Sequence, residues 1–305
     1  MVAIVEHNAA PEFEYGVVDQ LSENVRRVIC NNPGSFTFTG TGTYIVGRGE
    51  VAVIDPGPAD ETHIEAIMAA TLGETITHIL VTHTHIDHSP GCRILQEQSN
   101  APTFAFGPHG VLESGGGFGA DTEFQPDQQL LDSDCITVGG LQIQAVHTPG
   151  HASNHLSFYL ASENALFCGD VVMGWSTTIV SPPDGNMKDY MASLQKLLDR
   201  DDSVYYPTHG SPIPDPQSYV RQLFSHRKAR EDQVLALIQQ GVSRVPDMLP
   251  LIYHDLDHSM LPAAERSLSA TVECLLEEGR IVTDKRGVKG TLTLVSDDNA
   301  SAADD

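Results

Sequence analysis

The first part of the chain alternates between apolar and polar stretches in the manner of short β-strands. Three runs rich in apolar and β-branched residues are separated by glycines: 36–39, 43–47 and 51–55. Residues 60–70 follow the helical period instead, with apolar side chains on one face. The apolar run 76–81 then ends directly at a histidine cluster. Strand, helix and strand in this order predict an α/β unit whose last strand leads into that cluster.

Similar apolar runs recur in the middle of the chain and predict further strands: 103–106, 141–146, 156–160, 165–168 and 203–206. The amphipathic pattern over 187–199 predicts a helix. Residues 112–124 contain several glycines and predict a flexible loop. Open α/β sheets bind ligands beyond the carboxyl ends of their strands, so functional residues are expected there.

The pattern changes after Pro216. Helical periods continue over three stretches and are followed by two short strand patterns: 219–240, 245–253, 263–278, 281–283 and 291–294. Three helices and a hairpin are typical of a winged helix. We therefore expect a catalytic domain over residues 1–218, a winged-helix domain over 219–295, and a disordered acidic tail over 296–305.

Composition narrows the class of protein. The 305 residues are 40% hydrophobic, and no run of eighteen apolar residues suggests a membrane span. The N-terminus lacks the pattern of a signal peptide, and the five cysteines are scattered without a C-x-x-C pair, so we expect a cytoplasmic enzyme. The formal net charge of −24 counts against general nucleic-acid binding.

Potential metal ligands are concentrated directly after the run 76–81. His83, His85, Asp87 and His88 place four of them within a single short loop. Imidazole and carboxylate groups suit zinc, with iron or manganese as substitutes. Without a metal, the loop would place several titratable groups in one cleft with no compensating partner. The pattern therefore predicts a metal centre.

Three further donors stand just past predicted strands. His151 follows a T-P-G turn, Asp170 follows the run 165–168, and His209 follows the run 203–206. One loop cannot complete two coordination shells, whereas seven donors suit two metal ions that share one carboxylate. We therefore expect a dinuclear centre with two zinc ions per chain.

The order of these motifs resembles that of the metallo-β-lactamase superfamily, in its glyoxalase II-like branch. H-x-H-x-D-H, T-P-G-H, G-D and T-H-G follow one another over residues 82–210. Further motifs, among them N-P-G at 32–34 and S-H-R-x-x-R-E-x-Q at 225–233, resemble the β-lactamase-like protein two family, whose animal members are mitochondrial endoribonucleases. The resemblance implies an α/β fold: a four-layer αββα sandwich followed by the winged helix.

The resemblance also implies how the ligands divide between two ions: His83, His85 and His151 around one, and Asp87, His88 and His209 around the other. Asp170 would bridge both ions. True zinc β-lactamases generally carry cysteine or serine at that position, so the chain looks unlike a dedicated antibiotic-resistance enzyme. Gly42, where relatives often have asparagine, and residues 152–154 depart from the family pattern near the implied cleft.

The implied chemistry is hydrolysis by a hydroxide between two ions, because paired cations lower the pKa of a shared water. Asp87 is the expected catalytic residue, which would orient the hydroxide and pass its proton to the leaving group. The favoured substrate is a small ester, thioester or lactone. A single-strand endoribonuclease and weak β-lactamase activity are the alternatives. Against RNA, only Lys285, Arg286 and Lys289 form a basic spot in the C-terminal part.

Several residues outside the metal ligands are candidates for the substrate pocket or for supporting the site. Trp175, Phe36 and Phe38 are candidates for lining the substrate pocket, and the two phenylalanines would suit a core equally well. His155 opens a predicted strand and is expected to support the site or pack in the core. We expect the C-terminal domain to close over the cleft or to form a homodimer contact, rather than to bind DNA.

Overall fold

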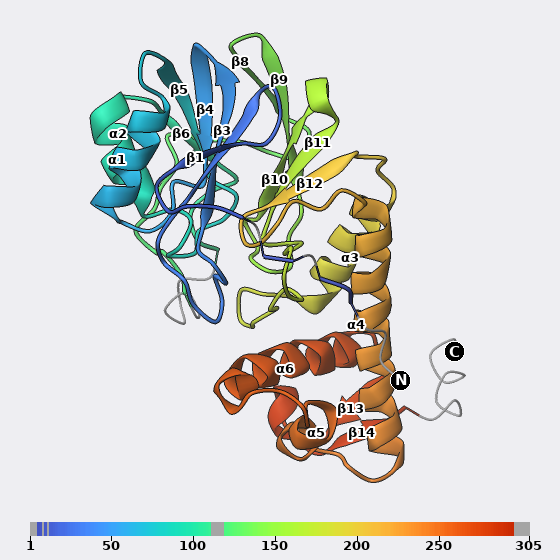
Figure 1. Ribbon diagram of the computed structural model, residues 1–305. Helices are drawn as coiled ribbons and strands as arrows, with labels where there is room; N and C mark the ends of the chain where they lie inside the picture. The colour runs from blue at the N-terminus through green and yellow to red at the C-terminus, as the bar shows by residue number, and fades with distance from the viewer. Residues whose placement is uncertain (1–4, 8, 11, 111–118, 296–305) are drawn as a thin grey trace.

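The computed structural model describes residues 5–7, 9–10, 12–110 and 119–295. The expected acidic tail and residues 112–118 of the expected glycine-rich loop lie outside the described residues. Two β-sheets face each other in the larger part of the molecule, and a smaller helical part follows at the C-terminal end (Figure 1). No helix in the described ranges is both long and apolar enough to cross a membrane.

The first sheet has seven strands, which neighbour one another in sequence order. Their bounds are β1 (Val18–Gln20), β2 (Val25–Ile29), β3 (Gly42–Arg48), β4 (Glu50–Ile54), β5 (Thr75–Leu80), β6 (Thr103–Ala105) and β7 (Gln128–Gln129). Strands β1 to β4 pair antiparallel, and β4 to β7 pair parallel. Parallel pairing brings the loops after β4 and β5 to the same edge of the sheet.

The second sheet has five strands in the order β12-β11-β10-β9-β8. Their bounds are β8 (Cys135–Val138), β9 (Leu141–His147), β10 (Leu156–Leu160), β11 (Ala165–Gly169) and β12 (Val204–Pro207). Only β11 and β12 pair parallel in this sheet. The loops that follow them therefore open at one edge, as the loops after β4 and β5 do in the first sheet.

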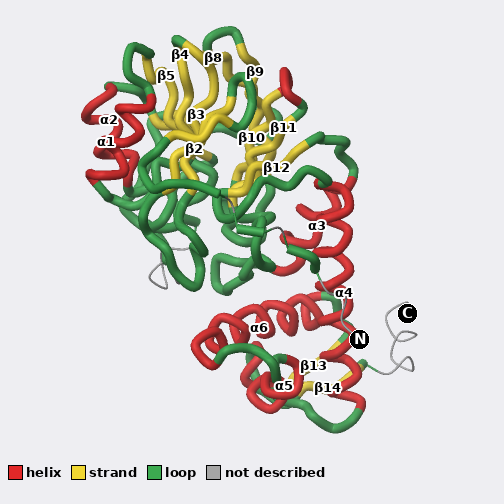
Figure 2. Tube along the Cα trace, viewed as in Figure 1, coloured by secondary structure: helices red, strands yellow, loops and turns green. Residues whose placement is uncertain are grey.

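Helices cover the outer face of each sheet, as Figure 2 shows. Their bounds are α1 (Glu61–Ala70) and α2 (Gly91–Ser99) on the first sheet, and α3 (Met187–Leu198) with the start of α4 (Pro216–Gln239) on the second. Asp60 begins α1, because its side chain accepts hydrogen bonds from the backbone N–H groups of Thr62 and His63. The expected four-layer αββα sandwich is confirmed.

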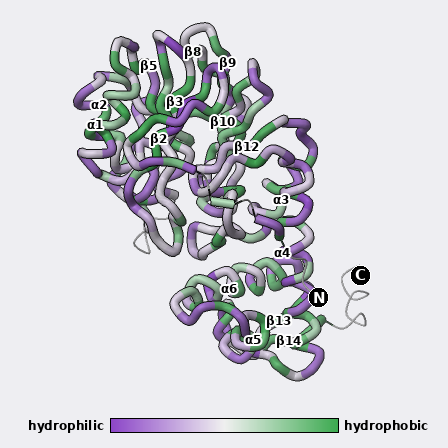
Figure 3. Tube along the Cα trace, in the orientation of Figure 1, coloured by the Kyte–Doolittle hydropathy of each residue, from purple (hydrophilic) through white to green (hydrophobic). Residues whose placement is uncertain are grey.

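Three apolar cores fill the spaces between these layers. Tyr44, Phe158 and Phe167 belong to the core between the two sheets, where side chains from both meet. A second core packs the first sheet against α1 and α2, and a third packs the second sheet against α3 and α4. Figure 3 accordingly shows hydrophobic colour concentrated along the strands. This packing fixes both sheets, so the loops at their shared edge rest on a rigid base.

The C-terminal part is a winged helix, as expected. Its elements are the second half of α4, α5 (Val245–Ile252), α6 (Leu261–Glu277), β13 (Ile281–Thr283) and β14 (Leu292–Leu294), with short 3-10 turns η2 (His258–Met260) and η3 (Gly287–Lys289). They enclose an apolar core of their own that includes Val234, Met248 and Leu275. Helix α4 is continuous with both parts and joins them (Figure 1). The exact domain boundaries stay a prediction.

The structure corrects one predicted strand. Residues 36–39 form a turn, in which the N–H of Phe38 donates to the carbonyl of Gly34 and Phe38 adopts a φ of 55°. A left-handed residue cannot continue a strand, so the alternating Phe-Thr pattern was misleading here. The sequence analysis also passed over β1, β2, β7, β8, α2 and the short turn η1 (Ala161–Glu163).

Candidate metal centre

The seven predicted ligands come from loops at the shared edge of the two sheets. The loop after β5 carries four of them, and the loops after β9, β11 and β12 carry His151, Asp170 and His209. Because both sheets pack face to face, these loops meet across the sandwich. Three groups of their ligand atoms lie within 4.8 Å of one another: His83, His85 and His151; His83, His88 and Asp170; Asp87, His88 and His209.

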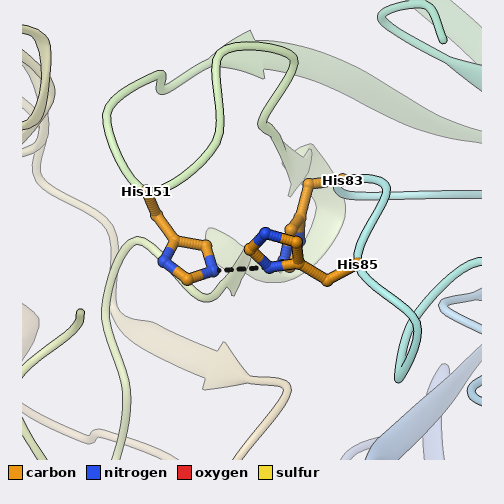
Figure 4. A group of neighbouring side chains, drawn as sticks. All are labelled: His83, His85 and His151. Atoms are coloured by element: carbon orange, nitrogen blue, oxygen red, sulfur yellow. Dashed lines mark hydrogen bonds between the residues drawn. The ribbon is translucent and has the colours of Figure 1, made fainter. Parts of the chain in front are cut away.

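The first triad contains histidines only. His85 Nδ1 lies 2.9 Å from His83 Nε2 and 3.0 Å from His151 Nε2, so three ring nitrogens converge on one point. Figure 4 shows the three rings turned toward each other, with His83 and His85 on the loop after β5 and His151 on the loop after β9. On its far side, His151 Nδ1 lies 2.6 Å from the carbonyl of Ile179. That carbonyl fixes Nδ1 as the donor and leaves Nε2 as the acceptor, which is the state that binds a cation.

The second triad combines two histidines with a carboxylate. Asp87 Oδ2 lies 3.2 Å from His209 Nε2, and Asp87 Oδ1 lies 3.6 Å from His88 Nε2. Both rings are oriented from behind: His209 Nδ1 is 3.1 Å from the carbonyl of Gly40, and His88 Nδ1 is 2.9 Å from Asp55 Oδ2. Each ring therefore presents Nε2 to the cleft, as a metal ligand does.

Asp170 lies between the two triads. Its Oδ2 is 3.5 Å from His88 Nε2, 3.6 Å from His209 Nε2 and 3.7 Å from His151 Nε2. One carboxylate oxygen thus faces ligands of both groups. This position is the one that a bridging carboxylate would need.

Three buried polar atoms in the cluster support a cation as the missing partner. His88 Nε2, His209 Nε2 and Asp170 Oδ1 make no hydrogen bond with the described part of the chain. Buried polar atoms are normally satisfied, so their common orientation toward one space calls for a ligand. Imidazole nitrogens and carboxylate oxygens are the donors that zinc prefers. The residues present therefore fit a divalent metal.

The two triads differ in their electrostatics. Burial, together with the neighbouring His151, lowers the pKa of His85 to about 3, and burial with His88 nearby lowers the pKa of His83, so both rings are neutral and can bind a cation. Burial also opposes protonation of His88 and His209, but the carboxylates of Asp87 and Asp170 outweigh it and raise the pKa of both rings. The second triad therefore lies in the negative field that attracts a cation.

Asp55 is a residue of the site to which the sequence analysis gave no role at the metal centre. Besides contacting His88, its carboxylate accepts hydrogen bonds from the Thr82 N–H at 2.7 Å, the Thr82 hydroxyl at 2.7 Å and the Thr208 hydroxyl at 3.1 Å. It is fully buried and follows β4, and its φ of 50° directs the chain into the next turn. Asp55 thereby ties the loops after β4, β5 and β12 together.

His155 lies directly behind the centre, in agreement with the supporting role expected for it. It is fully buried, and its Nε2 accepts a hydrogen bond of 3.1 Å from the backbone N–H of Asp170. Gly169 allows this contact, because it has a φ of +51° and an added Cβ would lie 2.5 Å from His155 Nε2. His155 and Gly169 together set the backbone position of the candidate bridging ligand.

A cavity of about 280 Å³ opens over the ligands. Phe36, Met173 and Ile179 give it apolar walls, and two polar residues that the sequence analysis missed, Asp184 and Arg266, also line it. Arg266 belongs to α6, so the winged-helix domain forms part of the cavity wall, as the expected closure over the cleft requires. Neither residue lies in a recognisable motif, so no sequence signal was available.

The three predicted pocket residues take different places. Phe36 lines the cavity, whereas Trp175 lines an adjacent pocket of about 190 Å³. Phe38 stacks on Trp175, with ring centroids 4.8 Å apart and an interplanar angle of 7°. Phe38 therefore supports the aromatic wall from behind.

Comparison with known proteins places this site in a family. Residues 37–209 match the metallo-beta-lactamase superfamily, and residues 245–289 match a beta-lactamase associated winged helix domain. The chain belongs to the metallo-β-lactamase superfamily. It is a hydrolase-like enzyme of that superfamily, with a histidine and aspartate cluster of the kind that holds metal.

Among the similar proteins of the metallo-β-lactamase superfamily, some are named as thioesterases and others as beta-lactamase-like proteins. An atrochrysone carboxyl ACP thioesterase of Aspergillus fumigatus is 35% identical over 231 residues, which cover 73% of this chain and 67% of the relative. A beta-lactamase-like protein 2 homolog of Drosophila melanogaster is 28% identical over 279 residues, covering 88% and 93%. The crystal structure of a beta-lactamase domain protein from Burkholderia ambifaria has the same fold, with a TM-score of 0.76 at 18% identity, covering 95% and 97%.

Proposed function

We propose that this protein is a dinuclear metal-dependent thioesterase with two zinc ions per chain. The observation that carries the proposal is the position of the ligand cluster, at the floor of a cavity whose walls include Phe36, Met173 and Ile179. Such walls suit the apolar part of an acyl thioester. The name of the Aspergillus fumigatus relative supports the same substrate class.

The residues of the chain would divide the work of hydrolysis between them. Two divalent ions held by the two triads would lower the pKa of a water and polarise the substrate carbonyl. Asp87 is the catalytic residue in this proposal. Its carboxylate lines the cavity and is 22% exposed, so it can take a proton at one oxygen and release it to the departing group.

Hydrolysis of a thioester needs little proton transfer to the leaving group. The leaving thiol has a pKa of about 8.5, so it can depart as the thiolate without being protonated first, unlike an amine or an alkoxide. Burial by itself would raise the pKa of Asp87, but the neighbouring His88 and His209 hold it well below its usual range. Asp87 therefore stays ionised and is a weak base, so a leaving group that needs little protonation, such as a thiolate, suits this site best.

A substrate panel tests the proposal directly. Zinc-loaded protein would be assayed against acyl thioesters, the matching oxygen esters, lactones, a β-lactam and single-stranded RNA. We expect the highest kcat/KM with thioesters. Faster turnover of RNA or of the β-lactam than of every thioester would contradict the proposed function.

Metal content gives an independent check. We expect close to two zinc ions per chain after reconstitution and removal of excess metal, because the donors exceed what one tetrahedral ion needs. Elemental analysis alongside an activity titration measures this. Full activity at one ion per chain would instead indicate a mononuclear centre.

Salt dependence separates a small substrate from RNA. We expect turnover of an uncharged thioester to be nearly flat in salt. Replacing Lys285, Arg286 and Lys289 together should change it little, because all three are exposed and none lines the metal cavity. RNA binding would weaken with a log–log slope of roughly −0.7 per phosphate neutralised on a single strand. Initial rates across a salt series, with and without the triple substitution, would reveal a steep slope if RNA were the substrate.

A further inference from the structure

The pocket next to the metal cavity is lined by two arginines, of which Arg227 is buried and Arg230 is half-buried. Phe36, Met173 and Ile179 line both spaces, so the second pocket begins where the first one ends. Helix α4, which joins the two domains, contributes Arg227 and Arg230 to the lining of this second pocket. A substrate that fills the metal cavity would therefore extend toward these two arginines.

Both arginines have neighbours that hold them in place without neutralising them. Arg227, which is only 5% exposed, donates to the carbonyl of Thr178 and packs 5.3 Å from the centre of the Tyr190 ring. Arg230 donates to the carbonyl of Ile252 at 3.1 Å. Within the described residues neither guanidinium pairs with a carboxylate, although the chain has a net charge of −24.

Several buried polar nitrogens in this pocket make no hydrogen bond with the described residues. The Nε atoms of Arg227 and Arg230, the Nδ1 atom of His226 and the Nε1 atom of Trp175 are buried and make no hydrogen bond there. All four side chains line the same pocket. A buried charge without a charged partner is costly, so the buried Arg227, the adjacent Arg230 and the unsatisfied N–H of Trp175 indicate that an anion belongs here.

The electrostatic potential in this pocket is positive, as a site for an anion requires. Burial, with Arg227 and Arg230 nearby, lowers the pKa of His226 to about 3. Burial likewise lowers the pKa of Arg230, and the adjacent charge of Arg227 adds to that effect. The cationic forms of His226 and Arg230 are thus disfavoured by burial and by the adjacent Arg227, and a bound oxyanion would relieve this.

We propose that Arg227 and Arg230 form an oxyanion site that receives an anionic end of the substrate while its thioester lies at the metal centre. Guanidinium groups suit phosphate and carboxylate, because their donors form paired hydrogen bonds with two oxygens. The anion comes either from a phosphate on the thiol portion or from a carboxylate on the acyl portion. The choice of substrates rests on the proposed thioesterase activity, whereas the anion site itself does not.

The single tryptophan of the chain provides a direct binding assay. Trp175 lines the proposed site, so its fluorescence should report an anion there. Zinc-loaded protein would be titrated with inorganic phosphate and, separately, with succinate. We expect saturable binding to the unchanged protein. We expect at least roughly 10-fold weaker binding after Arg230→Gln, the size expected for loss of a charge-assisted hydrogen bond.

Arg221→Gln is the matched control, because Arg221 lies on the same helix but is exposed and lines neither pocket. It should bind both anions as the unchanged protein does. Equal affinities of the unchanged protein and Arg230→Gln would overturn the proposal, since they would place the anion at the metal centre only. Absence of saturable binding to the unchanged protein would overturn it as well.

Kinetics then identify which end of the substrate carries the anion. One pair of thioesters compares butyryl-pantetheine with its 4′-phosphate, and a second pair compares butyryl- with succinyl-pantetheine. We expect one anionic member to have a KM at least roughly 10-fold lower than its neutral partner, and this ratio to approach one in Arg230→Gln. A ratio that persists in that variant would contradict the site. If no thioester is hydrolysed, the thioesterase proposal fails, and the titration still decides the anion site.

Discussion

Replacing Asp170 with alanine should lower the rate of hydrolysis by more than about 100-fold. Loss of a residue that only supports a metal ligand typically costs roughly 10–100-fold. Asp170 Oδ2 faces ligands of both triads, at 3.5 Å from His88 Nε2 and 3.7 Å from His151 Nε2. The substitution removes the only carboxylate that lies between the two groups in the described cluster. Neither metal position would then keep its full set of donors.

Two comparisons separate this effect from a general disturbance. His155→Ala removes the ring that accepts the Asp170 N–H, and should cost roughly 10–100-fold, the loss typical of a supporting residue. Asp201→Ala changes an exposed aspartate before β12 and should leave activity intact. Rates and zinc content of all three variants would be measured together. Equal metal loss in Asp170→Ala and His155→Ala would mean that His155 is itself a ligand.

The strands that form the floor of the site could be predicted because their composition is simple. The run 165–168 is continuously apolar and buried on both faces, and the run 76–81 ends in three buried apolar residues. Strand β2 was missed for the opposite reason. It contains Arg26 and Arg27, which are buried in the sheet and pair with Glu74 at 2.7 Å and Asp19 at 3.1 Å. Because the partners of these arginines lie elsewhere in the sequence, the local pattern does not indicate a buried strand.

The set of seven candidate ligands could be predicted from its position after strands, and the structure brings all seven together. That each of them binds metal stays a prediction. The residues that orient them could not be found in this way. Asp55 acts through His88, which is 33 positions away in the sequence. Arg227 donates to the carbonyl of Thr178, whose hydroxyl donates to the carbonyl of Asp170. Such contacts exist only once the two sheets and α4 have packed.

Replacing Asp55 with asparagine should reduce zinc affinity and activity by roughly 10–100-fold while preserving the fold. The carboxylate lies 2.9 Å from His88 Nδ1 and so keeps the proton on that nitrogen, which leaves Nε2 for the metal. Asparagine has nearly the same shape, but one of its two terminal groups is a donor. At the Oδ1 position that group would face the Thr82 N–H, and at the Oδ2 position it would face His88 and the hydroxyl groups of Thr82 and Thr208. Either placement sets two donors against each other.

Asp60→Asn is the matched control, because the same chemical change is made at the residue that caps α1. Asparagine caps a helix about as well as aspartate, so this variant should keep its stability, zinc and activity. Zinc retained after dialysis against a weak chelator, and rates at saturating zinc, would be compared for both variants. Because Asp55 acts through the His88 ring, high zinc concentrations should restore part of the activity of Asp55→Asn. An unchanged zinc affinity would show that the buried carboxylate stabilises the loops without tuning the ligand.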